Sequence, residues 1–188
     1  MGIIKKAGDL VYTFRFLRLL TMNFEDMEAY KLGLIDEKGK KLKNAETSEE
    51  KDVYTPFHKL VFNIKKLIPA GKIGSYASAL YLLKDNYGIS DSKITHGLEL
   101  LDIDITDILS EGSQWLILED GRLSPGSYRV KNAKLLNVTL DEMVNSKDRI
   151  KVEPNTYPIG EILGLNIYEA THVNTKKKIY ITIDELLL

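Results

Sequence analysis

The sequence predicts an α+β fold, with an N-terminal helical, bundle-like half followed by a small antiparallel β-barrel or sandwich. Up to residue 101, apolar residues recur at steps of three and four, the period of an amphipathic helix. From residue 103 onward, β-branched residues, alternation and turn dipeptides take over, and several short strands at this spacing are typical of a barrel or sandwich. We therefore expect an α-helical domain over 1–101, a connector over 102–112 and a β-rich domain over 113–188.

The first expected helix runs from Leu10 to Met22, with Asp9 as its N-cap. Its side chains form two adjacent stripes, which together make a wide apolar surface edged with positive charge. This surface fits a helix that packs in the core or between subunits, and it also fits a basic amphipathic helix that grips a partner or lies on a membrane. The candidate partner-contact residues are Leu10, Phe14, Arg15, Leu17 and Arg18.

No targeting segment is expected at the N-terminus. The apolar run 10–20 follows Lys5 and Lys6 as in a secretion signal, but charged residues interrupt it and no small-x-small cleavage site follows. A membrane-spanning helix needs about 20 uninterrupted apolar residues, which this run lacks. The opening Met1-Gly2 lacks the Ser or Thr at position 6 that myristoylation requires. We expect no membrane span.

Two short elements precede the central helices. Asn23 is expected to cap a helix over Phe24–Leu32, which Gly33 closes in the left-handed conformation. Residues 34–42 place two apolar ends around a charged Glu-Lys-Gly tip, which favours a small β-hairpin, with a plain loop as the alternative. The lysines of this tip fit a solvated face better than a phosphate contact.

Residues 51–87 are expected to form a helical hairpin around which the rest of the helical half folds. Thr47 and Glu50 have the spacing of a capping box, which indicates the start of the first helix of this hairpin. Pro56 falls within the helical period, so the helix either bends there or begins near Thr55. A Pro-Ala-Gly-Lys turn leads into the second helix, and Ser90 is expected to cap a last helix over 91–101.

The β-rich half is expected to contain short strands separated by turns. Residues 141–145 are expected to form a single helical turn. The expected strands are Trp115–Leu118, Ser127–Lys131, Leu135–Leu140, Arg149–Glu153, Ile159–Leu163, Asn166–Val173 and Lys177–Ile183.

Composition excludes several classes of function. The formal net charge of −1 gives no global field that attracts nucleic acid or an acidic membrane. The chain has no cysteine, which excludes disulfides, thiolate zinc sites and cysteine nucleophiles. There is no P-loop, because Gly71 to Gly74 lacks the required spacing, and no G-x-S-x-G elbow.

Titratable residues form no recognisable catalytic or metal-binding pattern. His58, His96 and His172 lie in three different segments and are expected to be surface or boundary residues. The alternating acids over 102–107 resemble a cation site, but an EF-hand loop would need a Gly and a terminal Glu at fixed positions. We therefore expect no cofactor, no metal site and no enzymatic activity.

Nucleic-acid binding is the alternative function, because single-strand binders combine basic and aromatic side chains on a barrel. Acidic residues nearby dilute the positive field, and tyrosines in a small barrel more often pack in its core or rim. The candidate nucleic-acid contacts are Tyr128, Arg129, Lys131, Lys176, Lys177 and Tyr180.

Several runs of the chain resemble a poorly characterised protein family of large contractile-tailed bacteriophages of the marine and cyanobacterial type. The resemblance is carried by the runs 7–20, 29–39, 47–51, 55–65, 75–80, 123–128 and 179–182. It implies a phage protein that is made in the host cytoplasm and is attached to the virion or used in head assembly, with other phage structural proteins or further copies of itself as partners. It implies no catalytic residues.

Two tripeptides look like sites cut by the head-maturation protease of such phages. Leu109-Ser110-Glu111 falls in the expected connector, where cleavage would spare both halves. Ile167-Tyr168-Glu169 falls inside an expected strand. The sequence thus favours a non-enzymatic structural or assembly protein that acts through protein–protein contacts.

Overall fold

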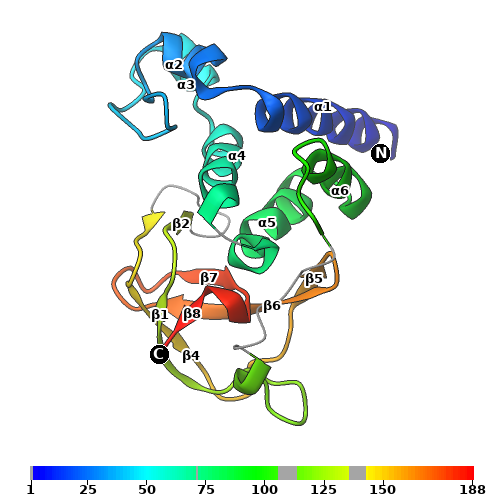
Figure 1. The fold of residues 1–188 in the computed structure, drawn as a ribbon, viewed down its shortest axis with the longest axis vertical. Coiled ribbons are helices and arrows are strands. Elements are labelled where there is room, and N and C mark those ends of the chain that lie inside the picture. Colours follow the sequence, from blue (N-terminus) through cyan, green and yellow to red (C-terminus); the bar gives the residue numbers. More distant parts are fainter. Residues whose placement is uncertain (1, 71, 106–113, 136–142) are drawn as a thin grey trace.

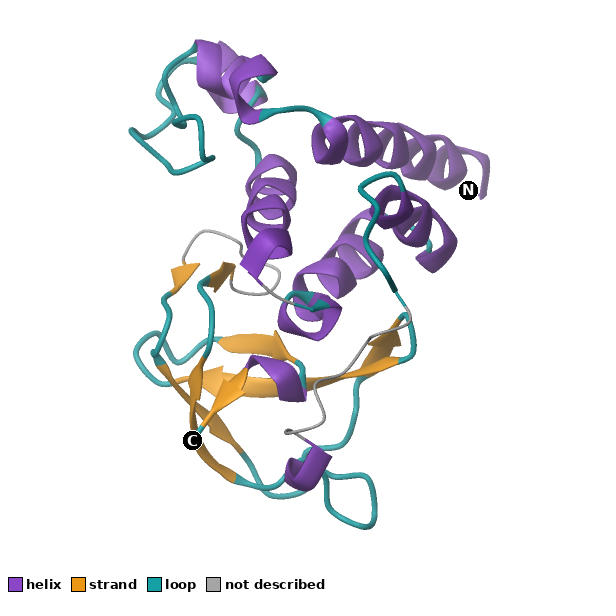
Figure 2. Ribbon diagram, in the orientation of Figure 1, coloured by secondary structure: helices purple, strands orange, loops and turns teal. Residues whose placement is uncertain are grey.

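A computed structural model of the chain describes residues 2–70, 72–105, 114–135 and 143–188 (Figure 1). Helices occupy the N-terminal part and antiparallel strands the C-terminal part, which confirms the α+β class (Figure 2). The α-helices are α1 (Gly2–Thr21), α2 (Glu28–Lys31), α3 (Ser48–Asp52), α4 (Pro56–Leu67), α5 (Ala77–Tyr87) and α6 (Asp91–Glu99). Short 3₁₀ turns are η1 (Phe24–Asp26), η2 (Ile68–Ala70), η3 (Ile73–Ser75), η4 (Gln114–Leu116) and η5 (Ile183–Glu185).

Local capping hydrogen bonds fix where the central helices begin. The Thr47 hydroxyl accepts the backbone N–H of Glu50 while the Glu50 side chain accepts that of Thr47, so the predicted capping box is confirmed. Of the two alternatives at Pro56, the helix begins there, because Thr55 caps α4 and Pro56 is its first residue. At the C-terminus of α5, Gly88 takes the left-handed conformation that closes a helix.

The expected helix over 24–32 is divided into η1 and α2. Met27 separates them in an extended conformation, and its side chain is buried. Burying this residue in a small apolar cluster with Leu34, Ile35 and Phe62 outweighs the continuous helical pattern that the sequence indicates. The hairpin expected over 34–42 is represented by a single antiparallel bridge between Ile35 and Lys41.

The sheet is antiparallel and is centred on its longest strand, β6, which pairs with β4, β5 and β7. Strand β4 also pairs with β1, and β1 pairs with the C-terminal β8, while β2 and β3 form a separate two-stranded ladder. The strands are β1 (Gly126–Val130), β2 (Lys134–Leu135), β3 (Met143–Val144), β4 (Arg149–Val152), β5 (Gly160–Ile162), β6 (Leu165–His172), β7 (Lys178–Ile181) and β8 (Leu186–Leu187).

The expected barrel is not formed by the described strands, because no ladder among them closes the sheet on itself. The predicted alternation of exposed and buried side chains is confirmed in β4. Alternation specifies which face of a strand is buried, whereas closure depends on which edges meet, and a sequence pattern does not encode that.

Two local predictions in the β-rich part are wrong. Residues 114–116 form η4, so the expected strand is reduced to a single bridge between Ile117 and Leu123. Residues 143–144 form β3 where a helical turn was expected, since Val144 is buried opposite Lys134 of β2. Residues 136–142 of these expected elements lie outside the described part.

The principal core joins the helices to the sheet. Helix α5 lies between α4 and the strands β5, β6 and β7, as Figure 1 shows. Its stripe residues Leu80 and Leu83 belong to the same buried cluster as Ile64 of α4 and Ile162 and Ile167 of the sheet. A second cluster fills the sheet itself. The helical half and the β-rich half therefore share one core along α5.

Candidate functional site

Helix α1 buries one side and leaves a second apolar side open. Phe16 and Leu20 are fully buried in the principal core, where they contact Gly97 of α6. On the other side, Leu10, Val11 and Phe14 are 54%, 48% and 65% exposed. The helix thus carries more apolar surface than the fold uses.

The structure divides the predicted partner-contact residues into two groups. Leu10, Phe14, Arg15 and Arg18 lie at the surface, whereas Leu17 is half-buried and packs against the principal core. The sequence could not separate these groups, because apolar residues occur on almost every side of this helix. Tertiary packing against α4 and α6 selects Phe16 and Leu20 as the buried stripe.

A cleft of about 320 Å³ adjoins the exposed side of α1. Val11, Arg15, Arg18 and Met22 are separated by steps of four, three and four, so they share one stripe of the helix, and its last three members line the cleft. The apolar part of the lining is Leu19, Met22, Met27, Ala29, Val53 and Phe62, and the polar part is Arg15, Arg18, Asp26, Glu28, Lys31, Asp52 and His58.

Most charges in this cleft are not paired with one another. Glu28 forms an ion pair with Lys31 at 2.8 Å. Within the described part of the chain, no ion pair within 4.0 Å involves Arg15, Arg18 or Asp52. The cleft therefore combines two arginines of α1 with charges of both signs from other segments and with an apolar lining.

His58 contributes a neutral imidazole to the cleft. Its Nδ1 accepts the backbone N–H of Thr55 and lies 2.7 Å from the Thr55 hydroxyl, so the ring proton resides on Nε2. Burial, and secondarily the charge of Arg15, lower the pKa of His58 to about 4. The ring is therefore uncharged at neutral pH and does not add to the positive charge of α1.

The predicted nucleic-acid contacts do not form a continuous stacking surface. Tyr128 is buried and donates its hydroxyl proton to the Ser124 carbonyl at 2.7 Å, so its ring is enclosed in the second core. Tyr180 is half-buried, and its ring packs edge-on against Tyr81 with 5.3 Å between centroids. The basic residues Arg129 and Lys176 are exposed, and Lys131 and Lys177 are half-buried.

The histidines are not equivalent. His96 is exposed on α6, as expected. The expectation for His172 is wrong, because this residue is buried, with Nε2 3.1 Å from Asp148 and Nδ1 2.9 Å from the Thr175 hydroxyl. These partners tie β6 to the loop before β4, which explains how a polar ring is accommodated in the sheet.

The remaining sequence motifs lie mostly outside the described residues. Asp107 of the acidic run and the tripeptide 109–111 fall in the segment 106–113, which lies outside the described residues. The described residues contain no group of three or more His, Cys, Asp or Glu side chains that could hold a metal ion. The second tripeptide lies in β6, where Ile167 and Tyr168 are buried, so a protease could reach it only after the strand had left the sheet.

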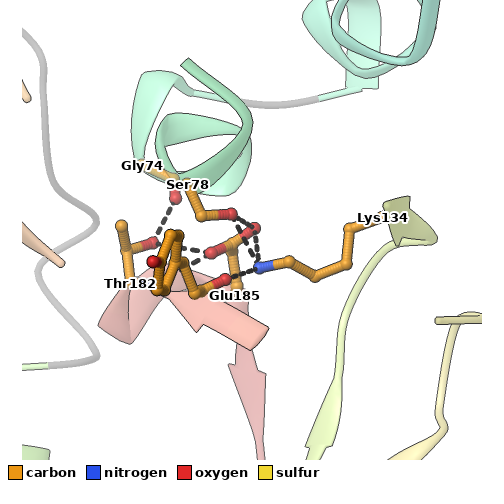
Figure 3. Close-up of polar contacts among 6 residues, drawn as sticks. Gly74, Ser78, Lys134, Thr182 and Glu185 are labelled. Atoms are coloured by element: carbon orange, nitrogen blue, oxygen red, sulfur yellow. Dashed lines mark hydrogen bonds and ion pairs between the residues drawn. The ribbon is translucent and has the colours of Figure 1, made fainter. Parts of the chain in front are cut away.

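A buried polar network, which sequence reasoning did not find, connects the helices to the sheet (Figure 3). Lys134 Nζ of β2 lies 2.9 Å from Glu185 Oε1 of η5, and both side chains are 3% exposed. The same amine donates to Ser78 Oγ of α5 at 2.7 Å and to the Tyr180 carbonyl of β7. Helix α5, strand β2 and the C-terminal segment of β7 and η5, which are distant in the sequence, therefore meet at one charge.

The second carboxylate oxygen of Glu185 also has a fixed partner. Its Oε2 accepts the backbone N–H of Thr182 at 2.8 Å, and the Thr182 hydroxyl donates to the Gly74 carbonyl of η3. Burial lowers the pKa of Lys134, and the charge of Glu185 opposes that shift. A visible signal was the pair Asp184-Glu185 inside the apolar run 179–188, since charges within such a run are usually buried with a partner.

The network is built for cohesion and not for catalysis. A serine hydroxyl 2.7 Å from a lysine amine is also the arrangement of Ser–Lys hydrolases. Here Ser78 is fully buried and donates to Glu185 at 2.8 Å, while the amine is paired with the same carboxylate. The hydroxyl is closed to a substrate, and the amine is not available as a base.

Comparison of the chain with protein-family models, with curated proteins and with solved structures gave no match. Among the described helices, none combines the length and the apolar character that crossing a membrane requires.

Proposed function

We propose that this protein is a non-enzymatic structural or assembly component of a tailed bacteriophage, associated with the virion or its head, which acts by binding other proteins. It is made in the host cytoplasm and joins its partners during assembly. The assignment to a phage is supported by the sequence resemblance, and the mode of action by the surface of α1.

The observation that carries the proposal is the exposed apolar side of α1. Leu10, Val11 and Phe14 remain about half or more exposed on a helix whose opposite side is fully packed. Complete burial of such a side chain is worth about 1.5–3 kcal/mol, so covering the exposed part would contribute on the order of 1 kcal/mol from each. A contiguous apolar surface rimmed by polar residues is the usual mark of a protein-contact site.

The neighbouring cleft favours a protein over a nucleic acid as the ligand. Arg15 and Arg18 would attract phosphates, but Asp26, Glu28 and Asp52 line the same cleft and would repel them. A protein surface can present charges of both signs together with an apolar anchor. Met22, Met27 and Phe62 would receive such an anchor, since methionines adapt their shape to a partner.

The test is purification of the phage particles followed by quantitative mass spectrometry. The proposal predicts that this chain copurifies with the capsid proteins in a fixed ratio that resists washing with salt and detergent. Its absence from particles and from assembly intermediates would refute a structural or assembly role.

Nucleic-acid binding through Arg129, Lys131, Lys176 and Lys177 is the second candidate, supported by the exposure of Arg129 and Lys176. The affinity should then fall steeply with added salt, because phosphate contacts release counterions. Absence of retention of single-stranded DNA or RNA at low salt would exclude it.

A further inference from the structure

A small basic cavity lies beside α4, away from the exposed side of α1. Its volume is about 130 Å³, well below the roughly 300–1,000 Å³ of sites for drug-sized ligands. Its described lining residues are Gly39, Lys41, Tyr54, Lys59, Phe62, Asn63, Lys66, Leu135 and Met143. The size admits one small ion and excludes a larger organic ligand.

Among the described lining residues the ionisable groups are Lys41, Lys59, Lys66 and Tyr54, so at neutral pH this part of the lining is positive. Within the described part of the chain, none of these lysines forms an ion pair within 4.0 Å. Lys59 Nζ lies 5.4 Å from the centre of the Tyr54 ring, which holds this amine near the cavity.

Asp36 is a negative charge that acts on Lys66, and backbone N–H groups hold its carboxylate in place. Asp36 accepts the backbone N–H groups of Lys38 and Lys40 at 2.9 and 2.8 Å. Burial lowers the pKa of Lys66, and the negative charge of Asp36 opposes that shift. The described lining thus carries three ammonium groups, and the charge of Asp36 offsets part of the positive charge at Lys66.

Asn63 provides an independent sign of a ligand site. This residue lies on α4, lines the cavity and is 3% exposed. Its amide nitrogen Nδ2 is buried and has no hydrogen-bond partner. Buried polar atoms in folded proteins nearly always have a partner, so an amide left without one beside a basic cavity calls for a bound acceptor.

We propose that this cavity binds one phosphate-sized oxyanion, with Asn63 donating a hydrogen bond from its amide and Lys41, Lys59 and Lys66 supplying the positive charge. Ammonium groups and amide N–H groups are the donors that proteins use for phosphate oxygens. The cavity goes beyond the proposed function: it shares Phe62 with the large cleft but neither the exposed side of α1 nor the arginines of that cleft.

The experiment measures thermal unfolding of the intact chain in increasing inorganic phosphate, against sodium chloride at matched ionic strength. A ligand that binds only the folded state raises its stability in proportion to the logarithm of ligand concentration above Kd. We expect a saturable binding isotherm and a rise in Tm with phosphate that chloride does not reproduce. A Tm that rises equally in both salts would overturn the proposal.

Two variants and a matched control locate the site. Asn63→Leu has a similar volume and removes the unpaired amide, and the surface variant K59Q/K66Q removes two charges. Both should weaken phosphate binding at least tenfold, as read from phosphorus NMR line broadening in folded protein. The control K51Q/K93Q removes two exposed lysines elsewhere and should bind as the wild type does. Equal loss in the control would show a general charge effect and refute the site.

The source of the phosphate group is read by competition. A short 5′-phosphorylated oligothymidylate that displaces inorganic phosphate, when the unphosphorylated strand does not, would assign the site to a phosphate carried by nucleic acid. Lack of displacement by either strand would assign it to the free ion. Both results presuppose that the site exists. The proposal of the site is refuted if phosphate does not bind, or if its binding does not depend on Asn63.

Discussion

Removing the charge of Lys134 should strongly destabilise the protein. In Lys134→Met, the methylene chain keeps its place, but Glu185 becomes a carboxylate at 3% exposure without its cation, and Ser78 and the Tyr180 carbonyl lose a donor. Breaking a buried ion pair from one side costs about 3–5 kcal/mol, a large part of the roughly 5–15 kcal/mol that stabilises a typical domain. For a chain of this length the loss corresponds to about 6–20 °C in Tm.

The companion variants separate the orphaned charge from simple loss of contacts. The double variant K134M/E185Q removes both charges of the buried pair, so it should recover about half or more of the loss, giving a coupling energy above about 1 kcal/mol. Lys131→Met, at a half-exposed lysine of the same segment, should change stability by less than about 0.5 kcal/mol.

The assay is urea unfolding followed by circular dichroism, with the slope m checked for each variant. If Lys134→Met loses less than about 1 kcal/mol, or if the double variant is no better than the single one, the reasoning about the buried pair is wrong.

Three further predictions concern single residues. The pKa of His58 is lowered from 6.5 to about 4, so its contribution to folding stability is complete above pH 6.5 and is lost as pH falls toward 4. In His58→Gln, the pH dependence of stability over this range should be smaller by roughly 2–3 kcal/mol. An unchanged curve would contradict this prediction. A Cβ on Gly74 would lie 1.9 Å from Asp184 Oδ2, so Gly74→Ala should cost about 1–3 kcal/mol in urea unfolding, whereas wild-type stability would mean that the two segments separate easily. The pKa of Glu50 is lowered from 4.5 to about 2, chiefly by its hydrogen bond to Lys43, so its contribution to folding stability is present above pH 4.5 and is lost toward pH 2. In Glu50→Gln, the loss of stability between pH 4.5 and pH 2 should therefore be smaller. An acid-unfolding midpoint and steepness identical to those of the wild type would refute this prediction.

Features that depend on neighbouring residues in the chain could be predicted from the sequence. The capping box of Thr47 and Glu50 and the left-handed Gly33 are encoded within a few positions, and both are present. The stripe of Leu80 and Leu83 on α5 is buried because its period alone defines one apolar face. Local hydrogen bonding and hydrophobic periodicity thus make most of the helical half predictable from the sequence.

Features that depend on distant residues could not be predicted. The partner of Lys134 lies 51 positions away in sequence, and no periodicity relates them. The short β8 pairs with β1 across more than fifty residues, and its two residues are too few for a pattern. On α1, apolar side chains surround the helix, so only packing against α4 and α6 determines which side is left for a partner.

The proposed role of α1 is tested most directly by measuring incorporation into phage particles of a variant that changes only its exposed side. Val11→Ser combined with Phe14→Ser removes two side chains that are 48% and 65% exposed, so the fold should be retained. Leu100→Ser, at 53% exposure beyond α6, is the matched control. Quantitative mass spectrometry of purified particles should show at least a tenfold loss of the α1 variant and normal amounts of the control. Equal incorporation of both variants would contradict the claim that this protein works through the exposed side of α1.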